Sequence, residues 1–282
     1  MPLAQKSRPQ AEAAINSRDN RWLKRFRAAL RGNEIEDDII GLEGPHLVED
    51  ALSASLDLPA ILSCPAGEEH LARLRPRIGP HTQLLRTTDK LFESVAATRT
   101  PQGIAALAKI HRAGLDDLLL TAGHNALVVA LVAVQDPGNV GTAIRAAEGF
   151  GASGAAITSG SADPWNQKSL RASSGSALRL PILAGVQAAT VMAQLRIAGV
   201  KLIAADSTEG HLPHELDFTG PVALFIGNEG AGLPGEVLRS ASARVRIPLA
   251  GRVESLNAAV AASVLLYEAA RQRNAAGARR SP

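Results

Sequence analysis

Residues 221–234 read Pro221-Val-Ala-Leu-Phe-Ile-Gly-Asn-Glu-Gly-Ala-Gly-Leu-Pro234, an apolar run that ends in a turn with three glycines. The run from Val222 to Ile226 does not alternate with polar residues, which is typical of a strand buried on both faces of a parallel sheet. Such strands deliver their loops to the carboxyl edge of the sheet, where ligands bind. Glycines allow positive φ angles and let backbone amides approach a ligand closely. The stretch therefore predicts a ligand-binding turn in an α/β domain.

The glycine turn also has a plainer interpretation, a tight connection between a strand and a helix. A phosphate loop for nucleoside triphosphates requires Lys and then Ser or Thr after its last glycine, whereas Leu233 and Pro234 follow here. Glu229 would also repel a phosphate. The sequence leaves the bare turn and the ligand-binding turn both open, and it disfavours a nucleoside triphosphate as the ligand.

The composition is that of a globular protein with room for two domains: 282 residues, of which 46% are hydrophobic and 20% charged. The single cysteine, Cys64, excludes an internal disulfide and a cysteine-based zinc site. We find neither a signal peptide nor an apolar run of membrane-spanning length, so we expect a cytoplasmic protein. The net charge is only +3, but basic residues concentrate near both ends, which indicates either a polyanionic partner or two solvated tails.

The pattern of apolar runs divides the chain into two α/β domains. Residues 1–18 are polar and are predicted to form a disordered basic tail, and residues 19–110 alternate short apolar runs with helix-like segments. Residues 111–126 are interpreted as a linker. Residues 127–274 alternate strands and helices again, which predicts a mostly parallel sheet covered on both faces, and a basic tail follows at 275–282. The strands expected in the second domain are 127–134, 155–158, 200–205, 222–226 and 245–249.

Two basic segments are candidates for contacts with RNA. The segment 19–31 predicts an amphipathic helix whose basic residues either lie on RNA backbone or stay in water. A second, polar segment at 159–176 would hold RNA phosphates or form a plain surface loop. The candidate RNA-binding residues are Arg21, Lys24, Arg25, Lys168 and Arg171.

A second turn, Asp136-Pro-Gly-Asn139, follows the first strand of the second domain. Pro and Gly force this turn, and Asn139 is suited to cap the next helix. The apolar stripe of that helix leaves Arg145 off it, either in solvent or facing a ligand at the edge of the sheet. The pattern Gly149-Phe-Gly-Ala-Ser-Gly154 matches a dinucleotide fingerprint, but it closes a helix and opens a strand, so we interpret it as a helix end and a turn.

The last predicted helix, Ser255 to Arg273, is apolar nearly all round as far as Tyr267. A helix of this kind is buried on more than one side. Because no later element follows to cover it, we predict a subunit interface on this helix.

Three segments, in order and spacing, resemble the motifs of the SpoU/TrmH family of RNA ribose 2′-O-methyltransferases. The resemblance spans residues 127–273, and the N-terminal half, with Glu43-Gly-Pro-His-Leu-Val-Glu-Asp50 and Thr100-Pro-Gln-Gly103, looks more loosely like the family's ribosomal-protein-like substrate-binding domain. The three segments are Asp136-Pro-Gly-Asn-Val-Gly-Thr-Ala-Ile-Arg145-Ala-Ala-Glu-Gly-Phe-Gly151-Ala, Phe225-Ile-Gly-Asn-Glu-Gly-Ala-Gly-Leu233 and Ile247-Pro-Leu-Ala-Gly-Arg-Val-Glu-Ser255-Leu-Asn257.

The resemblance implies an α/β domain of the SPOUT type, with a parallel sheet and a deep trefoil knot at its C-terminal end, beside a small N-terminal domain like ribosomal protein L30. It implies S-adenosylmethionine as the cofactor and a homodimer with the last helix at the interface. The implied substrate is structured RNA, with 23S ribosomal RNA as the first choice. The motif positions that would hold the cofactor are Gly227, Asn228, Ile247 and Leu256.

The implied reaction is an in-line displacement in which a ribose 2′-oxygen attacks the methyl group of a sulfonium, and it needs no metal. In the family pattern Arg145 activates the hydroxyl group. A guanidinium keeps its proton at ordinary pH and is a poor general base. We therefore expect Arg145 to grip the adjacent phosphate and stabilise the developing alkoxide, while water or phosphate takes the proton. The implied catalytic positions are Arg145, Asn139, Glu229, Ser255 and Asn257.

The other four catalytic positions also have plainer structural interpretations. Glu229 would pin the glycine turn by accepting backbone hydrogen bonds, and Asn139 and Ser255 would cap the helices that they open. Asn257 lies in an otherwise apolar helix start, where an amide needs a partner.

Three alternative functions stay open from the sequence. The first is a tRNA 2′-O-methyltransferase, the second a non-catalytic RNA-binding or ribosome-assembly protein that kept the fold, and the third a nicotinamide-dependent oxidoreductase. The oxidoreductase rests on the misplaced glycine pattern alone. The intact polar positions argue against a non-catalytic protein, and the separate N-terminal domain favours ribosomal RNA over the tRNA wobble position.

Overall fold

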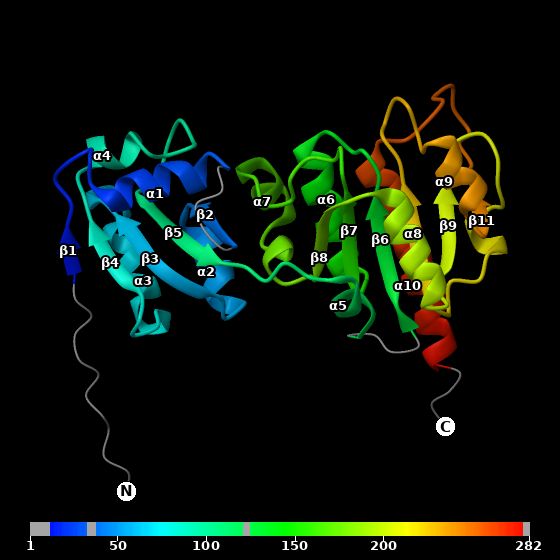
Figure 1. The fold of residues 1–282 in the computed structure, drawn as a ribbon, viewed down its shortest axis with the longest axis horizontal. Helices are drawn as coiled ribbons and strands as arrows, with labels where there is room; N and C mark the ends of the chain where they lie inside the picture. The colour runs from blue at the N-terminus through cyan, green and yellow to red at the C-terminus, as the bar shows by residue number, and fades with distance from the viewer. Residues whose placement is uncertain (1–11, 33–37, 121–124, 279–282) are drawn as a thin grey trace, which may run out of the picture. The chain divides into compact units, whose positions relative to one another are not determined.

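A computed structural model of the protein describes residues 12–32, 38–120 and 125–278, and Figure 1 shows its helices and strands. The chain forms two compact units, one built mainly by residues up to His111 and the other mainly by residues from Arg112 onward. Each unit is an α/β domain with its own sheet and its own hydrophobic core. Of the predicted basic tails, residues 1–11 and 279–282 lie outside the described residues.

The N-terminal unit holds a mixed five-stranded sheet in the order β1-β4-β3-β5-β2. Strand β5 runs antiparallel to both of its neighbours, and the other pairs are parallel. The amphipathic helix α1 packs onto this sheet, with Leu23 and Phe26 fully buried beside Phe92. The elements are β1 (Glu12–Ala14), α1 (Arg21–Leu30), β2 (Ile39–Glu43), α2 (Pro45–Ser53), β3 (Asp57–Ser63), α3 (Glu68–Leu74), β4 (Gln83–Arg86), α4 (Asp89–Glu93) and β5 (Ile104–Lys109).

The start of this sheet differs from the predicted disordered tail at 1–18. Residues Glu12–Ala14 form an edge strand that pairs in parallel with β4. The side chain of Ile15 is buried in the core, and the Glu12 carboxylate forms ion pairs with Arg86 (2.6 Å) and Arg75 (2.8 Å). The sequence pattern misses this strand because three residues are too few to show a period, and because its ion-pair partners lie far along the chain.

The C-terminal unit holds six parallel strands in the order β11-β9-β10-β6-β7-β8, so the predicted parallel sheet is confirmed. The pattern does not predict β8, because most of its residues are only partly buried and Gly185, with a φ of 78°, interrupts the run. Strand β11 begins earlier than the predicted 245–249 and overlaps it only at Val245. The predicted range contains Pro248, which lacks the N–H that a strand needs. The strands are β6 (Leu127–Leu131), β7 (Gly154–Thr158), β8 (Ile182–Val186), β9 (Lys201–Ala205), β10 (Val222–Ile226) and β11 (Ala243–Val245).

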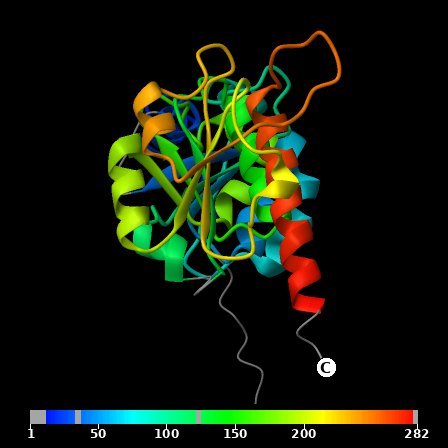
Figure 2. The ribbon, with the colours of Figure 1, turned by 90° about the vertical axis from the view of Figure 1, so that its right-hand side faces the viewer.

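Helices cover both faces of the parallel sheet, as Figure 2 shows. On one face α5, α8 and α9 place Leu118, Met192 and Val237 in a shared core with the strands. On the other face α6 and α10 pack against each other and against the sheet. Helix α5 lies within the predicted linker 111–126, because its buried Leu118 belongs to this core. The helices are α5 (Leu115–Leu120), α6 (Pro137–Gly149), α7 (Gln167–Ser173), α8 (Ala188–Ile197), α9 (Gly235–Ser240) and α10 (Ala258–Ala278).

The path of the chain after β10 brings its last helix back to an early one. Strand β10 lies between β9 and β6, and after it the chain passes through α9 and the edge strand β11 before it returns as α10 beside α6. The trefoil knot concerns how this path is threaded, and it stays a prediction. In the described part of the chain, no helix combines the length and the apolar character needed to cross a membrane.

Candidate active site

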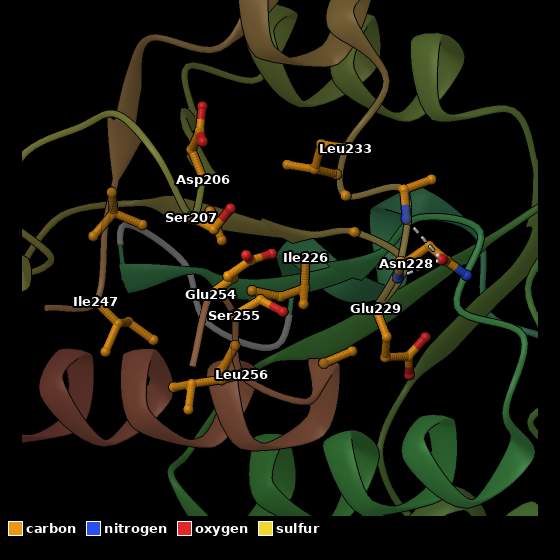
Figure 3. Close-up of a pocket in the computed structure, with 18 of the residues that line it drawn as sticks. Asp206, Ser207, Ile226, Asn228, Glu229, Leu233, Ile247, Glu254, Ser255 and Leu256 are labelled. Carbon is orange, nitrogen blue, oxygen red and sulfur yellow. Dashed lines mark hydrogen bonds between the residues drawn. The ribbon is translucent and has the colours of Figure 1, made fainter. Parts of the chain in front are cut away.

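The loops after three neighbouring strands, β9, β10 and β11, enclose a cavity of about 320 Å³. Because these strands are parallel, their carboxyl ends meet at one edge of the sheet, where open α/β sheets bind ligands. The segment that leads into α10 forms another wall, and Figure 3 shows Ile247 and Leu256 on that side. The lining residues fall within 205–207, 226–238, 245–249 and 254–261.

The glycine turn on β10 is held by Asn228. The side-chain oxygen of Asn228 accepts hydrogen bonds from the N–H groups of Gly230 (2.9 Å) and Ala231 (3.1 Å), and its amide donates to the carbonyl of Ala133 (3.1 Å). This arrangement corrects the interpretation that Glu229 pins the turn. Because Asn228 accepts the backbone hydrogen bonds of the turn, the carboxylate of Glu229 is available to another partner.

All four residues predicted to hold a cofactor line the cavity: Gly227, Asn228, Ile247 and Leu256. A β-carbon at Gly227 would lie 2.3 Å from the backbone carbon of Gly232, so a side chain does not fit there without moving the turn. Ile247 and Leu256 supply apolar surface that suits a flat heterocycle. The sequence motifs thus meet at one cavity although they come from different loops.

Sequence reasoning misses three polar residues of this cavity: Asp206, Ser207 and Glu254. Asp206 and Ser207 follow directly after β9, so the position of a carboxylate at the end of a buried strand is a signal that could have found them. Glu254 lies beside the motif residue Ser255, and nothing in its type or spacing distinguishes it from a surface glutamate.

The chemistry of the lining fits S-adenosylmethionine and does not fit a nucleoside triphosphate. Among the described residues that line the cavity, none is Lys, Arg or His, whereas three carry carboxylates: Asp206, Glu229 and Glu254. A triphosphate would be repelled by these charges, while a ligand with a sulfonium and an ammonium group would be attracted. The apolar walls and the volume also suit an adenosine-sized ligand.

A chain of hydrogen bonds connects the three motifs beside the cavity. The side-chain amide of Asn257 donates to the side-chain oxygen of Asn139 at 2.9 Å, and the amide of Asn139 donates to the carboxylate of Glu229. The side-chain oxygen of Asn257 accepts from the N–H groups of Ala259 (2.9 Å) and Val260 (3.3 Å). In both asparagines the side-chain NH₂ group therefore donates and the side-chain oxygen accepts. The network fixes the turn after β10 to the starts of α6 and α10.

The caps of the two helices differ from the predicted ones. Asp136, rather than Asn139, caps α6 by accepting from the Asn139 N–H at 3.0 Å. Asn257, rather than Ser255, occupies the capping position of α10, and Ser255 lines the cavity instead. The side chain of Asn139 therefore does not cap the helix, and its amide donates to Glu229 instead.

Arg145 lies on an exposed position of α6 and is not among the residues that line the cavity. Its guanidinium makes no hydrogen bond or ion pair with the described residues 12–32, 38–120 and 125–278. The structure therefore places four of the five predicted catalytic residues around the cavity and its hydrogen-bond network, and Arg145 apart from them on the same helix as Asn139.

The Asp206 side chain is only 9% exposed, and its carboxylate is held by its own loop. Burial acts to raise the pKa of Asp206, but hydrogen bonds from Thr208 and Glu209 and the charge of Arg244 outweigh burial and lower the pKa below its ordinary value. The bonds are 2.9 Å from the Thr208 N–H and 2.8 Å from its hydroxyl. The carboxylate stays ionised and stiffens this wall of the cavity.

The predicted RNA-binding residues of the second segment differ in their partners. The Lys168 ammonium forms an ion pair with Asp136 at 2.7 Å, and this pairing, with the bond from the Asn139 N–H, holds the pKa of Asp136 below its ordinary value. Arg171 is exposed on the same helix, α7. Lys168 thus tethers α7 to the start of α6.

Two of the three predicted RNA-binding residues of α1 lie beside one aromatic ring. The guanidinium of Arg21 lies 5.7 Å from the centre of the Trp22 ring, and that of Arg25 lies 5.0 Å from it. Lys24 is 3.7 Å from the Asp19 carboxylate. Such cation–π contacts stabilise the arrangement of the helix surface, and arginine and aromatic side chains are also the groups on which nucleic-acid bases stack.

Part of the basic C-terminal end has a structural role. The guanidinium of Arg273 donates to the carbonyls of Phe218 (2.9 Å) and Gly220 (2.7 Å), and burial lowers its pKa. Arg271 forms a two-pronged pair with Glu268, with both distances 2.7 Å. Arg273 therefore anchors α10 to the segment before β10, whereas the Arg271–Glu268 pair lies within the helix. Helix α10 continues to Ala278, within the predicted tail.

Comparison with known proteins identifies the family. Residues 126–267 match the model of the SpoU rRNA Methylase family, and residues 36–106 match an MRM3-like substrate binding domain. The chain belongs to the SpoU rRNA methylase family. It is 32% identical over 258 residues to the Bacillus subtilis 23S rRNA (guanosine(2553)-2′-O)-methyltransferase RlmP, which covers 92% of this chain and 98% of the relative. It is 35% identical over 195 residues to the 23S rRNA (guanosine-2′-O-)-methyltransferase RlmB of Xylella fastidiosa. This match covers 68% of this chain and 78% of the relative.

Solved structures of the SpoU family extend the likeness to both units. The AdoMet-bound rRNA methyltransferase from Sinorhizobium meliloti has a TM-score of 0.79 at 32% identity and covers 92% of this chain and 98% of its own. The SpoU methyltransferase AviRb from Streptomyces viridochromogenes, in complex with AdoMet, has a TM-score of 0.80 at 29% identity. The match covers 90% of this chain and 98% of the AviRb chain.

These comparisons decide between the alternatives that the sequence left open. The chain is an RNA 2′-O-methyltransferase with the SPOUT fold, and its cofactor is S-adenosylmethionine. The nicotinamide-dependent oxidoreductase and the non-catalytic RNA-binding protein are therefore both wrong. The substrate is RNA, and the choice of RNA is taken up below.

Proposed function

We propose that this SpoU enzyme methylates a ribose 2′-hydroxyl of 23S ribosomal RNA, and that its cavity between the ends of β9, β10 and β11 holds S-adenosylmethionine. The observation that carries the proposal is that the second and third motif segments line one cavity with apolar walls and three carboxylates, while Asn139 of the first motif donates to Glu229 of the second. The near full-length likeness to a Bacillus subtilis enzyme named for 23S rRNA supports the substrate. From this proposed substrate we expect the enzyme to act in the cytoplasm. The alternative substrate is tRNA.

The cofactor, when bound, supplies an activated methyl group. The residues of this chain then have to bind the adenosine, exclude water and bring a ribose hydroxyl into line. Gly227 and Asn228 shape the turn, while Ile247 and Leu256 offer apolar contact to the base. The cofactor-binding set in this proposal is Gly227, Asn228, Ile247 and Leu256.

Arg145 is proposed to orient the target nucleotide. Its exposed guanidinium has a fixed fork of donors, which suits a phosphate beside the reacting ribose and a developing alkoxide. A guanidinium does not accept a proton at ordinary pH, so water or the phosphate takes the proton of the hydroxyl. Asn139, Glu229 and Asn257 hold the loops in register, and Ser255 faces the cavity beside them.

The RNA is proposed to contact the basic residues of both units. In the N-terminal unit these are Arg21 and Arg25, which lie beside Trp22 on α1, and Lys24 on the same helix. In the C-terminal unit they are Lys168 and Arg171 on α7. The match of residues 36–106 to a substrate-binding domain supports an RNA-recognition role for residues 19–110, ahead of the methyltransferase domain at 127–274.

A homodimer through α10 is part of the proposal. Three large apolar side chains on this helix are exposed although they share one face at helical spacing: Val260 (47%), Val264 (38%) and Tyr267 (56%). Apolar residues gathered on one exposed helix face are typical of a protein contact. A second copy of the same helix is the partner we propose.

The experiment that tests the proposed function uses the purified full chain, labelled S-adenosylmethionine and unmodified 23S rRNA or tRNA. After transfer, the RNA is hydrolysed with alkali. A methylated 2′-oxygen cannot attack the neighbouring phosphate, so we expect label in alkali-resistant dinucleotides from 23S rRNA. Label in dinucleotides from tRNA alone would replace the substrate, and label in mononucleotides would refute ribose methylation.

A further inference from the structure

The three carboxylates of the cavity differ in what they contact. Asp206 accepts hydrogen bonds from its own loop and lies 3.5 Å from the Arg244 guanidinium. Glu229 accepts from Asn139. The carboxylate of Glu254 makes no hydrogen bond or ion pair with the residues that the structure describes, and Figure 3 shows it among the side chains that line the cavity.

The surroundings of Glu254 leave its charge without a protein counter-charge inside the cavity. The described lining residues include no Lys, Arg or His. Arg244, which follows the loop after β9, is engaged by two carboxylates of that loop, Asp206 at 3.5 Å and Glu209 at 2.8 Å. A carboxylate directed into a cavity with other carboxylates raises the local attraction for a positively charged ligand group.

We propose that Glu254 is the counter-charge for a cationic group of S-adenosylmethionine. The cofactor carries two such groups, the sulfonium and the α-ammonium, and the carboxylate of Glu254 is suited to either. A pairing with the sulfonium would favour the cofactor over its product, because the product has a neutral thioether. The inference rests on the methyltransferase function proposed above, but it concerns a binding equilibrium that needs no RNA.

The test is isothermal titration calorimetry on the purified full chain and its Glu254→Gln variant, without RNA. The ligands are S-adenosylmethionine, S-adenosylhomocysteine and 5′-methylthioadenosine, which lacks both cationic groups. We expect the variant to bind S-adenosylmethionine roughly threefold to fivefold more weakly and 5′-methylthioadenosine as well as the wild type does. A loss restricted to S-adenosylmethionine assigns the sulfonium, and an equal loss for S-adenosylhomocysteine assigns the α-ammonium.

The matched control is Glu236→Gln, which removes the same charge from an exposed position on α9 outside the cavity lining. We expect this control to bind all three ligands like the wild type. Raising the salt concentration from about 50 mM to about 500 mM should shrink the difference between wild type and Glu254→Gln, because an exposed charge pair is screened.

Three results would overturn the role of Glu254. They are an unchanged affinity of Glu254→Gln for S-adenosylmethionine, an equal loss for 5′-methylthioadenosine, and an equal loss in Glu236→Gln. A wild-type chain that binds none of the ligands would instead count against the proposed cofactor cavity itself. The failure of Glu254 and the failure of the proposed function are therefore distinguishable.

Discussion

Asn257, at the start of α10, donates its side-chain amide to the side-chain oxygen of Asn139 at 2.9 Å, although 118 positions separate the two residues in the chain. The bond joins the first motif to the third. Asn139 in turn donates to Glu229, which belongs to the second motif. A polar network of this kind acts as a unit, because each amide has one orientation that satisfies both of its neighbours. The loops around the cavity are thereby held in one register.

The Asn257–Asn139 bond can be separated from the capping of α10 by Asn257→Asp. A carboxylate still accepts from the N–H groups of Ala259 and Val260, but it cannot donate to Asn139. We expect a melting temperature near the wild-type value and methyl transfer reduced about tenfold. Asn257→Ala loses the cap as well, which should cost about 1 kcal/mol of stability. Wild-type transfer rates in Asn257→Asp would show that the network does not matter.

Gly227→Ala should disrupt the turn after β10. The added β-carbon would meet the backbone of Gly232 at 2.3 Å and the Leu233 nitrogen at 2.5 Å, and neither contact is with a flexible side chain. We expect cofactor affinity to fall about tenfold or more, measured by calorimetry. The matched control is Gly230→Ala in the same turn, whose β-carbon would lie 3.6 Å from the nearest atom. Equal affinities of the two variants would contradict the prediction.

Arg145→Lys tests the forked grip on the nucleotide. Lysine keeps the charge but offers a single ammonium in place of the planar fork. We expect methyl transfer to fall about a hundredfold, with cofactor affinity and melting temperature unchanged, because Arg145 lies outside the cavity and is exposed. Activity close to the wild-type value in Arg145→Lys would exclude a two-pronged contact.

The stability of the C-terminal unit should fall in acid partly through Asp206. Its folded-state pKa is lower than the unfolded value, so the ionised carboxylate stabilises the fold above that unfolded value, near 3.8. This contribution is fully present at pH 7 and is lost as the pH falls through the folded-state pKa. Asp206→Asn should therefore lower the free energy of unfolding at pH 7 and flatten its decline below about pH 4.

Thr208→Val gives a graded version of the same experiment. It removes the hydroxyl that donates to Asp206 at 2.8 Å but leaves the backbone donor in place. We expect the folded-state pKa of Asp206 to move up towards its ordinary value, so the stability that Asp206 contributes at pH 7 becomes smaller and its loss in acid is complete at a higher pH. Chemical denaturation at a series of pH values measures both variants, and identical curves for Asp206→Asn and wild type would refute the assignment.

The proposed dimer predicts the effect of a charge on the exposed face of α10. Val264→Glu places a carboxylate among Val260 and Tyr267, where burial against a second copy would be costly. We expect this variant to elute as a monomer in light-scattering chromatography and the wild type as a dimer. The control is Ile197→Glu, at an 87% exposed position on α8. A wild-type monomer, or a dimer that survives Val264→Glu, would contradict the α10 interface.

The sequence pattern found the central sheet for a local reason. The strands β6 and β10 are buried throughout, so their residues form unbroken apolar runs that are visible without any knowledge of the neighbours. The edge strand β1 and the half-exposed β8 have no such run, and the helix α5 occupies a segment interpreted as a linker. Their places depend on contacts with distant residues, such as Glu12 with Arg86.

The amino-acid pattern was enough to predict the family, the parallel sheet and the loops that form the cavity, because glycines, buried runs and motif order are properties of neighbouring residues. The partners of the polar side chains could be assigned only in the folded chain. In the fold, Asp136 and Asn257 cap helices α6 and α10, and Asn228 holds the glycine turn. Asn139 forms the long-range bond with Asn257. Side-chain hydrogen bonds depend on distances of a few ångströms between loops, and the path of the folded chain sets those distances.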